Sequence, residues 1–211
     1  MAKAQTFDDN YRVVEGWNIH YESALARTAP EKLQHALQLL ELKLTELNKV
    51  VPEKALAKLK DVHFWVSANA NNHSTVYHPS AQWLSSNGRN PAMAKGIQLQ
   101  NIDNFLTDAK TQPMAILHEL AHAYHQRIGL RDQNRIMKAY QNAMEKGLYK
   151  KVTRYGGRIK DVTAYAMNNE KEYFAELSEA YFGVNDYYPY TRDELEKYDP
   201  EGFTMLQAVW K

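Results

Sequence analysis

Two histidines and a glutamate stand at a spacing that binds zinc when it lies on a helix. His118, Glu119 and His122 form the pattern His-Glu-x-x-His inside the apolar run Ile116–Tyr124. Residues four apart share one face of a helix, so both imidazoles can bind a single ion. Glu119 projects about 100° away around the helix axis, where it can take a proton from the attacking water without acting as a ligand. The motif predicts metal-assisted hydrolysis, and the competing interpretation is a helix that carries ordinary surface histidines.

A zinc site of this kind needs a third ligand from the protein. One subclass places Gly three residues and His six residues after the second histidine, but those positions hold His125 and Ile128 here. His125 shares the face of His118 and His122 but lies a turn beyond them. Because three ligands from one unbroken helix cannot easily surround one ion, we expect His125 to be a structural or substrate-side residue.

A later helix with paired carboxylates can supply the missing ligand. Within Asn169–Leu177, Glu172 and Glu176 are four residues apart and share one helical face. One of them can bind the metal while the other accepts a hydrogen bond from a metal-bound imidazole. The alternative is a solvated acidic face, and we assign Glu170 and Glu179 to such a face. Apolar residues flank the pair, as expected of a helix packed against the first motif.

The two motifs together resemble the gluzincin metallopeptidases, and most closely the anthrax lethal factor and Pro-Pro endopeptidase group. The resemblance covers 113–182 and rests on His-Glu-x-x-His followed by Asn-x-x-Glu-Tyr-Phe-Ala-Glu. It implies that Glu172 binds zinc and that Glu176 is an outer-shell partner of a ligand. The group also has a tyrosine seven residues before the ligand glutamate, which is Tyr165 here. The resemblance implies that its hydroxyl donates to the oxyanion of the reaction, whereas the alternative is an aromatic residue that only packs.

The resemblance also implies a cleft for an extended peptide. In peptidases of this general fold, an edge strand upstream of the active-site helix pairs with the substrate backbone. The alternating stretch Gly96–Asn101 is the candidate strand, and Tyr77 and His78 are candidates for the wall of the cleft. The expected substrate-binding residues are therefore Gly96, Ile97, Gln98, Leu99, Tyr77 and His78.

Hydrophobic periodicity predicts strands in the first half of the chain and helices in the second. The expected strands are 11–14, 17–21, 62–66 and 96–101, with a loop at 69–72. The expected helices are 30–51, 53–60, 114–128, 133–146 and 170–182, with a last segment after Pro200. This order predicts an α+β fold, a zincin-like domain with a small N-terminal sheet and a helical C-terminal half. We expect a single catalytic domain, 1–211, with an N-terminal lobe over about 1–112 and a helical lobe over about 113–211.

The composition excludes several classes of protein. The 211 residues carry 26 basic and 25 acidic side chains, a formal net charge of +1, which disfavours nucleic acid as a partner. There is no cysteine, so any metal must bind His, Asp or Glu. No apolar stretch reaches membrane-spanning length and no signal peptide begins the chain, so we expect a soluble protein without membrane insertion. The resemblance implies a secreted or periplasmic location after removal of a leader.

The resulting functional hypothesis is a zinc-dependent endopeptidase that uses one Zn²⁺ ion and acts on a peptide or protein substrate. His118, His122 and Glu172 would bind the metal, and Glu119 and Tyr165 would be catalytic. Two alternatives stay open: a catalytically silent zinc-binding domain that captures peptides, and a helical binding module in which the motif is accidental. The composition does not fix an oligomeric state.

Overall fold

The computed structural model describes residue 7 and residues 11–68, 75–156 and 159–211. The loop expected at 69–72 lies outside the described residues. The chain divides into two compact units, one of Met1–Lys49 with Leu56–Ala109 and one of Val50–Ala55 with Lys110–Lys211. We call them the sheet unit and the helical unit and describe each by itself. Their main boundary falls near the lobe boundary expected at 112, while the single catalytic domain stays a prediction.

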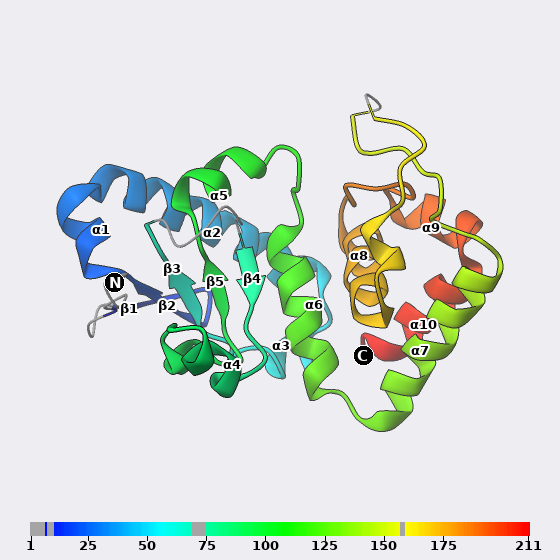
Figure 1. The fold of residues 1–211 in the computed structure, drawn as a ribbon, viewed down its shortest axis with the longest axis horizontal. Coiled ribbons are helices and arrows are strands. Elements are labelled where there is room, and N and C mark those ends of the chain that lie inside the picture. The colour runs from blue at the N-terminus through cyan, green and yellow to red at the C-terminus, as the bar shows by residue number, and fades with distance from the viewer. Residues whose placement is uncertain (1–6, 8–10, 69–74, 157–158) are drawn as a thin grey trace. The chain divides into compact units, whose positions relative to one another are not determined.

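A mixed five-stranded sheet forms the centre of the sheet unit (Figure 1). Its order is β1-β2-β3-β5-β4, with a parallel β2-β3-β5 core and an antiparallel strand at each end. The strands are β1 (Tyr11–Val14), β2 (Trp17–Tyr21), β3 (Phe64–Val66), β4 (Thr75–Tyr77) and β5 (Ile97–Leu99). β1 and β2 lie where the alternating pattern predicts them, and the short β4 was not expected.

The expectation that Gly96–Asn101 forms an edge strand is wrong. β5 lies between β3 and β4, so its backbone is hydrogen-bonded on both sides and cannot take up a further strand. The side chains of Ile97, Gln98 and Leu99 are also fully buried. Gly96 is required by close packing, because an added Cβ would lie 2.8 Å from the carbonyl oxygen of His63. The substrate contacts expected from this stretch are therefore not available.

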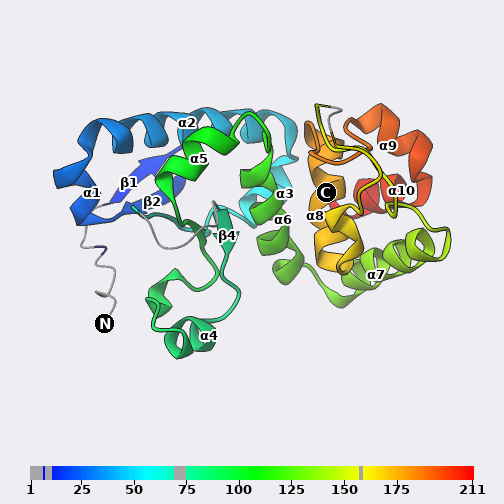
Figure 2. The ribbon, with the colours of Figure 1, turned by 45° about the horizontal axis from the view of Figure 1, so that its top comes forward.

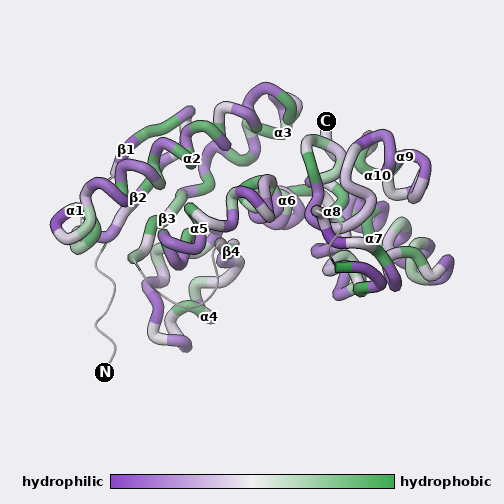
Figure 3. The backbone as a smooth tube through the Cα atoms, turned by 90° about the horizontal axis from the view of Figure 1, so that it is seen from above, coloured by the Kyte–Doolittle hydropathy of each residue, from purple (hydrophilic) through white to green (hydrophobic). Residues whose placement is uncertain are grey.

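Helix α2 (Pro30–Val50) covers the sheet unit with a leucine stripe. It runs along the sheet in both ribbon views (Figures 1 and 2), and apolar and polar positions alternate along its tube in Figure 3. Its buried residues are Leu33, Ala36, Leu37, Leu40, Leu44 and Leu47, the spacing of one helical face. The shorter helices are α1 (Ser23–Thr28), α3 (Glu53–Ala57), α4 (Ala81–Ser86), the 3₁₀ turn η1 (Pro91–Met93) and α5 (Ile102–Asp108).

The helical unit is arranged around helix α8 (Glu170–Phe182). This helix packs against every other described helix of the segment Lys110–Lys211. They are α6 (Ala115–Arg127), α7 (Leu130–Glu145), the 3₁₀ turn η2 (Tyr165–Met167), α9 (Arg192–Tyr198) and α10 (Pro200–Val209). Three stacked rings form the core, with Trp210 lying 4.2 Å from Tyr124 and 5.5 Å from Phe174 between ring centroids. A central helix of this kind can hold several side chains in fixed positions.

The fold is α+β, as the order of elements predicted. All described strands lie between residues 11 and 99, and the described residues from 110 to 211 contain helices, connecting loops and isolated bridges. Over the described residues, no helix is long and apolar enough to cross a membrane.

Candidate metal centre

Helix α6 presents the two histidines of the first motif. His118 lies in the first turn of the helix, where its amide donates to the carbonyl oxygen of Met114 at 2.9 Å. His122 follows one turn later, and the two ring centroids are 4.9 Å apart with the rings at 77°. Leu117 and Leu120 are buried and hold the helix against its neighbours. The imidazoles are thereby brought side by side on a helix fixed by apolar packing.

Helix α8 presents Glu172 from its own first turn. The side chain of Asn169 caps this helix by accepting hydrogen bonds from the amides of Lys171 and Glu172 at 2.9 and 3.0 Å. This is the usual N-cap arrangement and fixes where the first turn begins. Because α6 and α8 pack against each other, Glu172 faces the histidines of the neighbouring helix.

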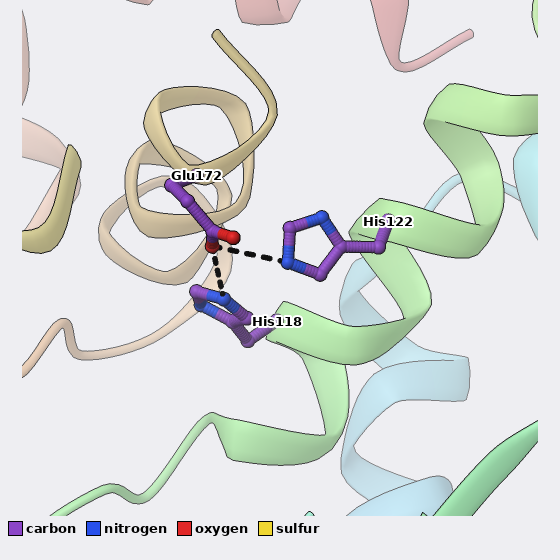
Figure 4. A group of neighbouring side chains, drawn as sticks. All are labelled: His118, His122 and Glu172. Carbon is purple, nitrogen blue, oxygen red and sulfur yellow. Dashed lines mark hydrogen bonds and ion pairs between the residues drawn. The ribbon is translucent and has the colours of Figure 1, made fainter. Parts of the chain in front are cut away.

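The three predicted ligands converge on one point (Figure 4). The same carboxylate oxygen of Glu172, Oε2, lies 3.1 Å from Nε2 of His118 and 3.1 Å from Nε2 of His122. The side chains of His118, His122 and Glu172 are 12%, 16% and 17% exposed, so the cluster is shielded but still open to solvent. The structure thus brings Glu172 next to two histidines that lie 50 and 54 positions earlier in the sequence.

This donor set fits a zinc ion. One ligand atom from each residue can be chosen so that all three lie within 4.8 Å of one another. Ligands about 2.1 Å from a tetrahedral zinc are about 3.4 Å from each other, so the observed spacing needs only small side-chain movements. Two imidazole nitrogens and one carboxylate oxygen are also a ligand set of catalytic zinc sites, which leave the fourth position to water or substrate.

The charges around His118 favour a cation. Burial, the largest influence, opposes protonation of His118, but hydrogen bonds with Glu172 and Glu179 still raise its pKa well above the usual value. Burial likewise raises the pKa of Glu172, yet the hydrogen bonds from His118 and His122 lower that pKa to about 2. The cluster therefore binds positive charge at its centre, as a proton or as a metal ion.

The carboxylate that contacts His118 on its other ring nitrogen is not the one expected. Nδ1 of His118 is 2.7 Å from Oε1 of Glu179, whose side chain is only 4% exposed. The assignment of Glu179 to a solvated acidic face is therefore wrong. Glu176 is also buried, but its Oε2 has no hydrogen-bond partner. Burial, and then the charges of Glu179 and Asp186, raise the pKa of Glu176 well above the usual value.

A second group of possible ligands overlaps the first. His118, Glu176 and Glu179 also have ligand atoms within 4.8 Å of one another. Both carboxylates of this group are buried, at 3% exposure, whereas every member of the first group is partly exposed. A metal that must meet a substrate needs an accessible position. The group of His118, His122 and Glu172 is the better candidate for chemistry.

Tyr165 and Glu119 both lie beside the cluster. The ring centroid of Tyr165 is 6.3 Å from that of His118, and its side chain is half exposed. Burial, and then the charge of Glu172, raise the pKa of Tyr165, so its hydroxyl remains a proton donor at neutral pH. Glu119 is half-buried and close enough for its charge to act on both His118 and Tyr165.

The remaining predicted residues have other surroundings. His125 is buried with its ring 6.1 Å from that of Phe174 and belongs to neither group of possible ligands. Tyr77 and His78 are buried in the sheet unit. Nε2 of His78 pairs with Oε1 of Gln98 at 2.9 Å, which gives it a structural role. The expectation that Tyr77 and His78 line a substrate cleft stays a prediction.

Comparisons with protein-family models, with curated proteins and with solved structures gave no match to this chain. The resemblance to gluzincins accordingly rests on the two sequence motifs alone and stays a prediction.

The position of Glu179 in the sequence is itself a signal for its place beside the cluster. Seven residues make almost two full helical turns, so Glu179 projects from the same face of α8 as Glu172. Asp186 was missed because it lies in a loop with no periodic pattern. Its buried carboxylate accepts hydrogen bonds from Gln112 at 3.4 Å and from Arg154 at 3.3 Å.

Proposed function

We propose that this protein is a zinc-dependent endopeptidase with a zincin-like catalytic domain. The observation that carries the proposal is the convergence of His118, His122 and Glu172, from two packed helices, with Glu119 next to the first histidine. Zinc, held by these three side chains, would act as a Lewis acid that makes water more acidic and a peptide carbonyl more electrophilic. A peptide or protein is the proposed substrate class.

In this proposal Glu119 moves the proton. Its carboxylate accepts a proton from the attacking water as the new bond from oxygen to the carbonyl carbon forms. It then returns that proton to the amide nitrogen as the carbon–nitrogen bond breaks, so that one water is consumed for each bond cut. Tyr165 donates its hydroxyl hydrogen to the negative oxygen that develops on the carbonyl, which its neutral phenol allows.

The Glu119→Gln variant tests the proton transfer separately from metal binding. The amide cannot accept the proton, so turnover of a peptide library should fall by about 10²-fold or more, while zinc content stays at the wild-type level. Glu145→Gln is a matched control, since Glu145 is exposed on α7 and belongs to neither group of possible ligands. Undiminished hydrolysis by purified Glu119→Gln protein would reject this role of Glu119.

The Glu172→Ala variant tests the ligand assignment. Metal analysis of protein purified without added zinc should show less zinc than in the wild type, because one of three ligands is lost. Wild-type protein that holds no zinc would exclude the metal centre altogether. Protein that holds zinc and captures peptides without cutting them would support a silent binding domain instead.

A further inference from the structure

His118 is held between two carboxylates of one helix. Its Nε2 faces Glu172 at 3.1 Å, and its Nδ1 faces Glu179 at 2.7 Å. The second distance is short for a hydrogen bond between nitrogen and oxygen, as expected when the acceptor is ionised. Both carboxylates come from α8, so the position of His118 relative to this helix is fixed at two points.

Glu176 is the other carboxylate on this face of α8, and it differs from Glu179 in its contacts. As whole residues, both are buried to the same extent, at 3% exposure. Glu179 accepts the Nδ1 hydrogen bond of His118, whereas Glu176 leaves Oε2 without a partner. The two residues are therefore a matched pair in which only one is engaged with the histidine.

We propose that Glu179, and not Glu176, is the residue that positions His118 for metal binding. An imidazole with its proton on Nδ1 has a free electron pair on Nε2, and the hydrogen bond to Glu179 keeps the proton on Nδ1. The same bond prevents rotation of the ring away from His122 and Glu172. This inference rests on the proposed metal centre and assigns its outer partner.

The surroundings of Glu179 make it suited to this role. Its side chain is 4% exposed, so water does not compete for the hydrogen bond. It lies on the central helix of the unit, which packs directly against the helix that carries His118. A positioning residue must itself be immobile, and a buried residue on a packed helix meets that condition.

The experiment compares the zinc affinity of two isosteric variants. We expect Glu179→Gln to weaken zinc binding about 10- to 100-fold, measured by competition with a chromogenic zinc chelator. We expect Glu176→Gln to bind zinc within about threefold of the wild type, because the hydrogen bond to Nδ1 of His118 comes from Glu179 and is kept in this variant. Glu196→Gln, in which an exposed residue of α9 is replaced, controls for the loss of one negative charge.

A spectroscopic measurement separates positioning from a general loss of structure. In zinc-loaded wild-type protein the Nδ1 proton of His118 should give a slowly exchanging downfield proton resonance. That resonance should move or broaden in Glu179→Gln and remain in Glu176→Gln. If Glu179→Gln does not fold, Glu179→Asp provides the test, since it keeps the charge but withdraws the oxygen from the ring and should also weaken zinc binding.

The outcomes distinguish this inference from the proposed function. Wild-type protein that does not bind zinc would reject the metal centre itself. Zinc binding by the wild type with no loss in Glu179→Gln would reject only the role of Glu179. A loss confined to Glu176→Gln would overturn the inference in favour of the assignment implied by the gluzincin motif.

Discussion

Replacement of Asp199 should show what fixes the central helix of the helical unit. Its Oδ2 accepts hydrogen bonds from the hydroxyls of Tyr149 at 2.9 Å and Tyr173 at 2.6 Å. Its Oδ1 accepts a third from the amide of Gly202 at 2.9 Å, at the start of α10. Burial, and then the charge of Asp199, raise the pKa of both phenols well above the usual value, so both remain donors.

The size of the effect follows from the burial of these donors. Asp199, Tyr149 and Tyr173 are each at most 3% exposed, so water cannot replace the lost carboxylate. A buried donor left without an acceptor costs about 1–3 kcal/mol. Three such donors, which are not independent, give a loss of about 3–6 kcal/mol in unfolding free energy for Asp199→Ala. Asp199→Asn keeps one acceptor oxygen and should lose about 1–3 kcal/mol.

Urea unfolding followed by circular dichroism measures both variants. Domains of this kind have about 5–15 kcal/mol of stability in total, so Asp199→Asn is the variant to measure first. Asp193→Asn is the control, because Asp193 is exposed on α9 and should change stability by less than about 0.5 kcal/mol. If Asp199→Asn is as stable as this control, the carboxylate does not hold the helices together as argued.

Two further predictions concern packing and pH. An added Cβ at Gly202 would lie 2.5 Å from the Tyr173 hydroxyl. The unfolding free energy of Gly202→Ala, measured in urea, should therefore be about 1–3 kcal/mol lower than that of the wild type. The control is Gln207→Ala, on the exposed side of α10, and equal stability of the two variants would contradict this prediction. Burial lowers the pKa of His78, although its bond to Gln98 opposes the shift. A lowered folded-state pKa means that the stabilisation is complete above the unfolded value of about 6.5 and is lost as the pH falls below it. The unfolding free energy should therefore drop more steeply between about pH 6.5 and 5 in the wild type than in His78→Gln, and parallel curves would refute the assignment.

Local sequence signals predicted most, but not all, of the helices of the second half. The bounds expected for α8 agree with the structure at both ends, because Asn169 caps its first turn and Gly183 follows its last. The expected α7 began three residues late, since its true start after Gly129 has no capping side chain. Helix α9 was missed although Thr191 and Glu194 form a capping box, which is a signal visible in the sequence.

The order of the sheet could not be predicted in the same way. The alternation in Gly96–Asn101 indicates a strand but does not say which strands flank it. The neighbour that closes its outer side is β4, whose three residues Thr75–Tyr77 are too few to show a period. The stretch expected at the edge of the sheet therefore lies in its interior, because β4 pairs with its outer side.

In the candidate site, too, contacts within one helix could be predicted from the sequence, whereas contacts between two helices could not. Spacing within one helix predicts that His118 and His122 lie together, and the structure brings them together as expected. Glu172 was predicted as a ligand from the resemblance of a motif, because no local rule connects residues on two helices. Two buried glutamates of α8 could contact His118. The crossing angle between α6 and α8 decides which of them does, and this angle cannot be predicted from the sequence.

The buried charges of α8 argue for a function more strongly than its motif does. Glu176 and Glu179 are almost completely removed from water, and the nearby Asp186 has one partly exposed arginine, Arg154, as its ion-pair partner. Burying carboxylates with so few cations is unfavourable, and apolar residues of similar size at these positions would generally give a more stable fold. Tyr173, which is buried on an adjacent face of the same helix and donates to Asp199, contributes packing that offsets this cost. Buried carboxylates with raised pKa values often gather at functional sites, so this arrangement is a reason to test the proposed metal centre.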